Sequence, residues 1–303
     1  GLGTLPDLDV FIDFGGAVEN FTYHRGFSHS LFVLAPFSAL LWLLLWRWWA
    51  PVRDDPLRWL AAISLTLLTH PLLDAHTAYG TQLFWPLTVP PTSWATLFII
   101  DPLYTLPLLA GVLLASFRRK LGGAALRVGL VISTLYVCWS WVAQTIVSRN
   151  VEDALASMQL QGAPVFLTPT PLNTLLWRAV VMTGDGYLEG FDSLVVDEET
   201  MRFTAYPSDT DAMQNADDIW AVRRLRWFAQ GFVKARIDDD RLVISDLRMG
   251  QEPFYVFSHV VAASGNPHWR EIQAELLPVS LDDRALAEIW DRIWRLPDAQ
   301  TTR

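Results

Sequence analysis

The sequence predicts a membrane α-helical bundle of about four or five transmembrane helices, followed by a mixed α/β domain. Two observations predict this class. The chain of 303 residues is 51% hydrophobic, but its long apolar segments all lie in the first half. Residues 1–147 carry eight acidic and eight basic residues, so the whole formal charge of −9 falls in residues 148–303. We therefore expect a membrane domain over residues 1–150 and an acidic soluble domain over residues 151–303.

Four segments are long and apolar enough to cross a bilayer, which takes about 20 residues. Tryptophans gather near their ends, as in the aromatic belts of membrane proteins. Residues 1–5 are compatible with the end of a further helix that begins before Gly1, so the expected number is four or five. The four segments cover residues 31–50, 57–75, 94–117 and 126–147.

The basic residues predict how these segments are oriented. The connections 51–56 and 118–125 contain or adjoin seven Lys and Arg residues, whereas the connection 76–93 has none. Loops rich in Lys and Arg stay in the cytoplasm. We therefore expect the loop 76–93, the patches His24–His29 and His70–His76, and everything after residue 147 to lie outside a cytoplasmic membrane.

The acidic second half reads as strands and amphipathic helices. Residues 177–183 and 187–195 flank a Gly-Asp-Gly turn, and residues 232–237 and 241–246 flank three aspartates, which predicts two hairpins. Residues 217–230 and 282–295 have helical periodicity. Residues 162–171 contain three prolines and predict an extended link. The acidic charge excludes nucleic acid as a partner, because that needs a basic face.

Histidines and aspartates gather where the apolar segments begin and end. Four of the six histidines fall in the first 76 residues, in or beside the patches Asp7-Leu8-Asp9, 24–30 and 70–74. Such groups are costly in hydrocarbon and rarely lie there without a partner. His70 and Asp74 are four apart and share one helix face. Imidazole and carboxylate groups without thiolate predict a divalent metal, zinc first, with manganese or iron as alternatives.

Arg25 and Asp101 are further candidates near these patches. A guanidinium matches phosphate or carboxylate in a bidentate way, so Arg25 is an expected anion clamp. Asp101 lies seven residues into the third apolar segment, about 10 Å deep, at a depth similar to that of His70. Each also has a simpler interpretation: Arg25 as a headgroup anchor, and Asp101 as a cap before Pro102.

Three motifs in this order resemble a known family. They are Leu5-Pro6-Asp7-Leu8-Asp9, then residues 24–30 with the sequence HRGFSHS, then residues 70–74 with the sequence HPLLD, followed by Phe84-Trp85-Pro86. They resemble the YdjM-like family of bacterial inner-membrane proteins described as metal-dependent hydrolases, over roughly residues 1–150. The resemblance implies a membrane-embedded hydrolase with a divalent metal, and carried over residue by residue its ligands are Asp7, Asp9, His24, His29, His70 and Asp74.

We expect a hydrolase whose site opens at the outer face of the bacterial inner membrane. Asp9 or Asp101 would act as general base, and Arg25 would hold an anionic group. The expected partners are the bilayer and a lipid-like substrate, and a phosphoester would fit Arg25 best. The sequence does not indicate a protein partner. The alternatives are a metal sensor or partner-binding protein without turnover, and a plain membrane anchor that binds no metal.

Overall fold

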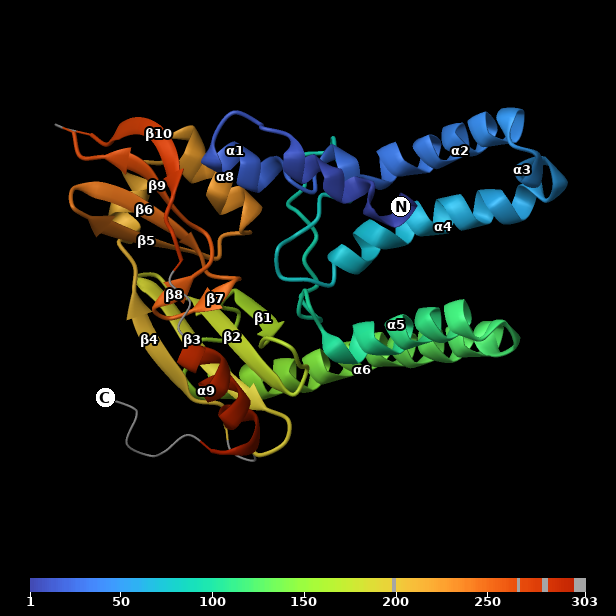
Figure 1. The fold of residues 1–303 in the computed structure, drawn as a ribbon. Helices are drawn as coiled ribbons and strands as arrows, with labels where there is room; N and C mark the ends of the chain where they lie inside the picture. Colours follow the sequence, from blue (N-terminus) through green and yellow to red (C-terminus); the bar gives the residue numbers. More distant parts are fainter. Residues whose placement is uncertain (198–199, 266–267, 280–282, 297–303) are drawn as a thin grey trace. The chain divides into compact units, whose positions relative to one another are not determined.

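The computed structural model describes residues 1–197, 200–265, 268–279 and 283–296 (Figure 1). The chain forms two compact units. The first combines Gly1–Trp94 with Asp209–Val279, and the second combines Ala95–Ser208 with Ser280–Arg303. The predicted boundary near residue 150 was based on the change in hydrophobicity and charge, whereas these two units are defined by which residues contact one another. One helix, α6, runs through residue 150 without a break.

A helical hairpin forms the apolar part of the first unit. It consists of α2 (Leu31–Trp48), the short α3 (Ala50–Asp54) and α4 (Pro56–Asp74). Ser30 caps α2 by accepting a hydrogen bond from the Phe32 amide, and Pro56 opens α4, where its missing N–H costs nothing. The two long helices run antiparallel, so α2 begins where α4 ends (Figure 1). The hairpin therefore places the predicted patches 24–30 and 70–74 at one end.

Short helical segments precede the hairpin. They are η1 (Leu2–Thr4), η2 (Pro6–Phe11), α1 (Ala17–Tyr23) and η3 (Phe27–His29). The first two contact α4, and η2 also contacts η3. The η2 helix thus brings its two aspartates to the end of the hairpin where the histidines lie.

Residues 209–279 add an antiparallel sheet to the first unit. The helices α7 (Thr210–Gln214) and α8 (Trp220–Phe228) precede it, and its strand order is β10-β9-β6-β5. The predicted hairpin at residues 232–246 is confirmed, with Asp239 and Asp240 in the left-handed conformation of its tight turn. The strands are β5 (Val233–Asp238), β6 (Arg241–Asp246), β9 (Ser258–Ala263) and β10 (Arg270–Leu276), beside a ribbon of β7 (Gly250–Gln251) and β8 (Phe254–Tyr255).

Helix α1 shares a core with this sheet. Its buried Phe21 ring lies 4.4 Å from the Phe257 ring and 4.8 Å from the Phe228 ring, measured between centroids. Arg224 of α8 donates to the hydroxyl and the carbonyl of Thr22 at 2.9 and 3.0 Å. The acidic half of the sequence therefore supports the segment that leads into the first histidine patch, an arrangement that composition did not predict.

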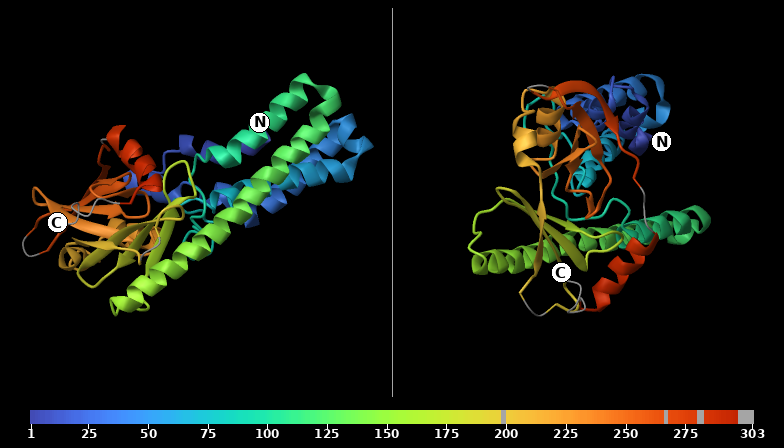
Figure 2. Two further views of the ribbon diagram at one scale, coloured as in Figure 1. Left: turned by 90° about the horizontal axis from the view of Figure 1, so that it is seen from below. Right: turned by 90° about the vertical axis from the view of Figure 1, so that its left-hand side faces the viewer.

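The second unit joins a helical hairpin to another antiparallel sheet. Helix α5 (Pro102–Phe117) packs along α6 (Arg119–Ser157), which is one long helix in Figure 2. The sheet order is β1-β2-β3-β4, and the predicted hairpin at residues 177–195 is confirmed as β2 with β3. Its strands are β1 (Val165–Pro169), β2 (Leu176–Met182), β3 (Gly186–Ser193) and β4 (Phe203–Pro207), and β1 lies inside the predicted extended link. Helix α9 (Asp283–Trp294) contacts β2 and β3. The first residue of the predicted helix 282–295, Asp282, lies outside the described residues.

Glycines allow α5 and α6 to approach closely. A Cβ atom at Gly129 would lie 2.4 Å from the Pro107 carbonyl oxygen, and one at Gly111 would lie 3.0 Å from the Ala125 carbonyl oxygen. Small residues at such seams are typical of helices that pack within membranes.

Within the described residues, two helices are long and apolar enough to cross a membrane by length and composition. They are α2 and the segment Lys120–Ser157 of α6; α5, with 16 residues, is shorter. All four predicted segments are thus largely helical, but α4 falls outside this pair although it has 19 residues. It carries Arg58, His70 and Asp74, which lower its mean hydropathy. Four or five spans remain a prediction.

Candidate metal site

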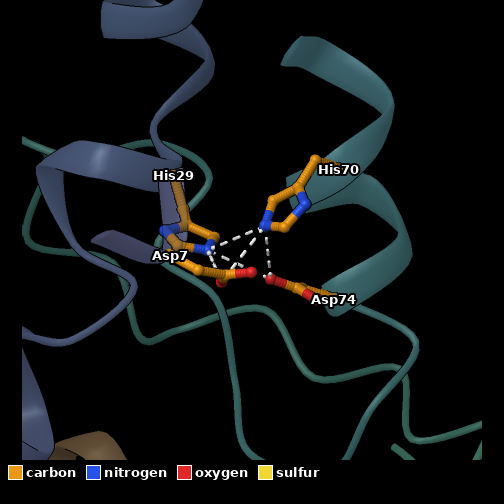
Figure 3. Close-up of side chains that lie close together, drawn as sticks. All are labelled: Asp7, His29, His70 and Asp74. Carbon is orange, nitrogen blue, oxygen red and sulfur yellow. Dashed lines mark hydrogen bonds and ion pairs between the residues drawn. The ribbon is translucent and has the colours of Figure 1, made fainter. Parts of the chain in front are cut away.

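Four of the six predicted ligands converge at the end of the α2–α4 hairpin. Asp7 comes from η2, His29 from η3, and His70 with Asp74 from the last turns of α4 (Figure 3). One donor atom from each lies within 4.8 Å of all the others. The i, i+4 spacing on α4 supplies two donors, and the chain contributes the other two from segments more than 40 residues away.

The spacing of the donor atoms fits a shared ion. His29 Nε2 lies 3.1 Å from Asp74 Oδ2, 3.4 Å from Asp7 Oδ1 and 3.3 Å from His70 Nε2. His70 Nε2 lies 3.3 Å from Asp7 Oδ1 and 3.4 Å from Asp74 Oδ2. Donors about 2.0–2.2 Å from a tetrahedral ion lie about 3.3–3.6 Å apart. Five contacts near this length are longer than charge-assisted hydrogen bonds, which are about 2.7–2.9 Å.

One buried oxygen supports the same interpretation. Asp74 Oδ2 is buried and accepts no hydrogen bond within the part of the chain that the structure describes. A buried carboxylate oxygen without a donor is costly unless a cation compensates it. Arg25 Nε at 3.4 Å and the imidazole nitrogens of His29 and His70 surround this oxygen without a hydrogen bond to it. The donor set present therefore fits a divalent ion bound by nitrogen and oxygen.

The cluster is closed on one side and open on the other. The His29 side chain is fully buried, and those of His70 and Asp74 are 18% and 15% exposed. The Asp7 side chain is 49% exposed. A small molecule can therefore reach the cluster past the side chain of Asp7.

Asp9 and His24, also predicted as ligands, lie outside this group of four. Asp9 Oδ1 lies 2.8 Å from His24 Nδ1. Asp9 Oδ2 accepts from the Arg25 amide at 2.9 Å and from the Ser28 hydroxyl at 2.5 Å. Both carboxylate oxygens are thus engaged by the protein itself, and Asp9 holds neighbouring groups in place.

Asp9 is ionised in this environment. Burial by itself would raise the pKa of Asp9, but the hydrogen bonds from His24 and Ser28, the His24 charge and the Arg25 amide together hold that pKa below its ordinary value. An ionised carboxylate only accepts hydrogen bonds. His24 therefore carries a proton on Nδ1.

Arg25 is buried beside the cluster. Its Nε lies 3.4 Å from Asp74 Oδ2, and its Nη1 donates to the Thr77 hydroxyl at 3.2 Å. Its guanidinium carbon lies 5.2 Å from the centre of the Tyr79 ring, in cation–π contact. The simpler interpretation, an anchor among lipid headgroups, does not fit a residue that is 7% exposed.

Asp101 belongs to the second unit. Its Oδ1 accepts from the Leu103 amide, so it caps α5, and its Oδ2 accepts from the Tyr136 hydroxyl at 2.8 Å. The simpler interpretation of Asp101 as a cap is therefore confirmed. Its predicted part in catalysis remains a prediction.

Sequence reasoning missed the contribution of Ser28 and Tyr79. Ser30 caps α2, and Ser28 links Asp9 to His29 through hydrogen bonds of 2.5 and 2.9 Å. Tyr79 donates to the Phe21 carbonyl at 2.5 Å and stacks against Arg25. The only available signal was position, since Ser28 directly precedes a predicted ligand.

Comparison with known proteins finds a family similar to the first part of the chain. Residues 1–147 match the sequence model of the family described as YdjM inner membrane protein. The matched residues contain all four members of the cluster, and the predicted resemblance is confirmed. Similarity to an inner membrane family supports association of this part of the chain with a bilayer.

Two relatives extend the comparison. YfhP of Bacillus subtilis (strain 168), described as uncharacterized, is 24% identical over 270 residues, which cover 84% of this chain and 78% of YfhP. YbcI of Escherichia coli (strain K12), described as an inner membrane protein, is 40% identical over 85 residues, which cover 28% of this chain and 47% of YbcI. The YfhP match extends beyond the region of the YdjM family, so it includes part of the acidic half. No solved structure matches the chain.

Proposed function

We propose that this protein is a metal-dependent hydrolase of the bacterial inner membrane that acts on a lipid or lipid-linked phosphoester. One observation carries the proposal. Four nitrogen and oxygen donors from three separate segments lie within 4.8 Å of one another, with separations that suit a tetrahedral ion. Two carboxylates balance the charge of a divalent cation, and two imidazoles favour zinc, with manganese or iron as alternatives.

The reaction would take place on the open side of the cluster, beside Asp7. A divalent ion held there would lower the pKa of a bound water and polarise the scissile bond. Because the four protein donors fill a tetrahedral shell, that water would bind as a fifth ligand or in place of the half-exposed Asp7. Arg25 lies against Asp74, and its buried Nε makes no hydrogen bond within the described residues, so we assign it to an anionic oxygen of the substrate.

Proton transfer falls to His24 in this proposal. Asp9 or Asp101 was the predicted base, but both oxygens of Asp9 accept hydrogen bonds from the protein, and Asp101 caps α5 in the second unit. Asp9 instead orients the His24 ring through Nδ1, and the His24 side chain is 22% exposed. Its Nε2 is the atom that takes a proton from the attacking water, and the neighbouring carboxylate stabilises the resulting charge.

The surroundings favour an amphiphilic substrate. Next to Asp7, the η2 helix exposes Leu8 and Phe11, whose exposed fractions are 50% and 83%. Exposed apolar groups of this kind suit contact with lipid. The distribution of Lys and Arg favours the outer face of the membrane for this end of the hairpin, with the C-terminal residues on the same side.

A hydrolysis assay with a matched variant tests the proposal. Detergent-purified protein is loaded with Zn²⁺, Mn²⁺ or Fe²⁺ and incubated with soluble phosphoesters and with fluorogenic phospholipids in mixed micelles. We expect turnover by the wild type and by Asp153→Ala, an exposed aspartate on α6, and none by Asp74→Ala or after chelation. Equal turnover by Asp74→Ala would contradict the proposal.

One observation favours the alternative of a metal site without turnover. Four protein donors complete a tetrahedral zinc shell, and such closed shells are typical of structural sites, whereas catalytic zinc usually keeps three protein ligands. A sensor or partner-binding protein would bind metal in the same assay and hydrolyse nothing. Bound metal together with an inert wild type would therefore favour this second function.

A further inference from the structure

Four polar groups beside the cluster form one connected chain of hydrogen bonds. It runs from His24 through Asp9 and Ser28 to His29. The links are His24 Nδ1 to Asp9 Oδ1 at 2.8 Å, Ser28 Oγ to Asp9 Oδ2 at 2.5 Å, and His29 Nδ1 to Ser28 Oγ at 2.9 Å. The chain ends on the nitrogen of His29 that faces away from the cluster.

The direction of each hydrogen bond follows from the chemistry of the groups. Asp9 Oδ2 is an acceptor, which also accepts from the Arg25 backbone amide at 2.9 Å. The single hydroxyl proton of Ser28 is therefore donated to Asp9 Oδ2. This leaves the lone pairs of Ser28 Oγ to accept from His29, and the proton of His29 must lie on Nδ1.

This fixes which nitrogen of His29 can bind a metal. A neutral imidazole with its proton on Nδ1 has a free lone pair on Nε2. Nε2 is the nitrogen that lies 3.1 Å from Asp74 and 3.3 Å from His70. The His29 side chain is fully buried, so water cannot supply the missing hydrogen bond if Ser28 is lost.

We propose that Asp9 and Ser28 are positioning residues, which act through hydrogen bonds to hold His29 in the tautomer and orientation that present Nε2 to the metal. The inference rests on the proposed metal site and assigns to Asp9 a role other than the predicted ligand or base. Partners of this kind behind a metal-bound histidine change metal affinity by about 10–100-fold when they are removed.

Titration with Co²⁺ tests the inference on the full-length protein in detergent. The dissociation constant is read from the visible absorption of bound Co²⁺, and Zn²⁺ competition gives the zinc affinity. We expect Ser28→Ala to weaken binding by about 10–100-fold and Ser28→Thr, which keeps a hydroxyl, to restore most of the affinity. Ser38→Ala is the matched control, because Ser38 is a buried serine on α2 that bonds Ala35 and Ser64. Wild-type affinity in a folded Ser28→Ala protein would overturn the inference.

A second readout does not depend on bound metal. Protein labelled with ¹⁵N-histidine is examined by NMR without metal, and the His29 signals are assigned with His29→Gln. We expect a protonated Nδ1 and an unprotonated Nε2 in the wild type, and a mixture of tautomers in Ser28→Ala. A proton on Nε2 in the wild type would overturn the inference. If the wild type bound no Co²⁺, the proposed function would be wrong. The NMR measurement would still show whether Ser28 holds His29 in the tautomer with its proton on Nδ1.

Discussion

His29 Nε2 lies 3.3 Å from His70 Nε2, although 41 residues separate the two histidines in the chain. Two imidazole nitrogens that face each other repel unless a proton or a cation lies between them. His29 Nδ1 carries the ring proton and donates it in a hydrogen bond to Ser28, and two carboxylate oxygens lie at similar distances from Nε2. A shared cation therefore satisfies all four groups at once.

Removing one of these histidines should remove the metal. We expect His70→Ala to lose stoichiometric Zn²⁺, Mn²⁺ or Fe²⁺ measured by elemental mass spectrometry of detergent-purified protein, because three donors in this group bind less tightly than four. His268→Ala, a change at an exposed histidine, should keep the metal content of the wild type. Equal metal content in both variants would place the ion elsewhere.

Replacing Arg25 should make folding depend on metal. Arg25→Met leaves the carboxylate of Asp74 without its guanidinium neighbour, and breaking a buried pair typically costs about 3–5 kcal/mol. We expect thermal unfolding to show this loss of stability in metal-free protein. With Zn²⁺ bound the loss should be much smaller, because the ion compensates the charge of the Asp74 carboxylate. Arg226→Met, which breaks an exposed pair with Asp217, should cost at most about 1 kcal/mol with or without metal. A loss at Arg25 that metal does not reduce would contradict this prediction.

His259 should make the first unit less stable in acid. Burial lowers the pKa of His259 to about 4 from an ordinary value of 6.5, and neither ring nitrogen has a hydrogen-bond partner within the described residues. The unfolded chain binds a proton at higher pH than the folded chain does. The contribution of the neutral ring to the free energy of unfolding is therefore fully present above about pH 6.5. It is lost as the pH falls toward 4, and the total loss is about 3 kcal/mol.

Unfolding by urea, followed by tryptophan fluorescence with chelator present, measures this effect. We expect the difference in free energy of unfolding between wild type and His259→Leu to change with pH between 6.5 and 4, in favour of the variant at the acid end. All other groups are the same in both proteins, so their contributions cancel in the comparison. A difference that stays constant over this range would show that His259 is not the group responsible.

The α5–α6 seam should not tolerate a side chain at Gly129. Gly129→Ala places a methyl group against the backbone of Pro107, and overpacking of this kind costs about 1–3 kcal/mol. Gly123 lies on the same helix, and among the described residues no atom outside its own helical turn lies within 4 Å of a Cβ added there. The helix preference of alanine should therefore make Gly123→Ala more stable by up to about 1 kcal/mol. Unfolding of the two variants in mixed micelles should therefore shift in opposite directions, and a shift in the same direction would argue against the close approach.

Much of this structure was predictable from short-range patterns. The hairpins at residues 177–195 and 232–246 followed from turn residues between apolar runs, and the helices of the membrane part followed from the apolar segments. The pairing of His70 with Asp74 followed from their spacing on one helix. The division near residue 150 followed from composition, and contacts divide the chain differently because α1 buries Phe21 among residues of the C-terminal sheet.

By itself, the sequence predicted the resemblance to the YdjM family, the apolar helices and the residue types of the candidate metal site, because these depend on local composition and on motifs. Only the tertiary structure decided which residues share the site. The antiparallel α2–α4 hairpin brings Asp7 and His29 to Asp74, while Asp9 and His24 bond each other. Metal binding depends on donor separations of a few ångströms, and residues more than 40 positions apart in sequence reach such separations only through helix packing.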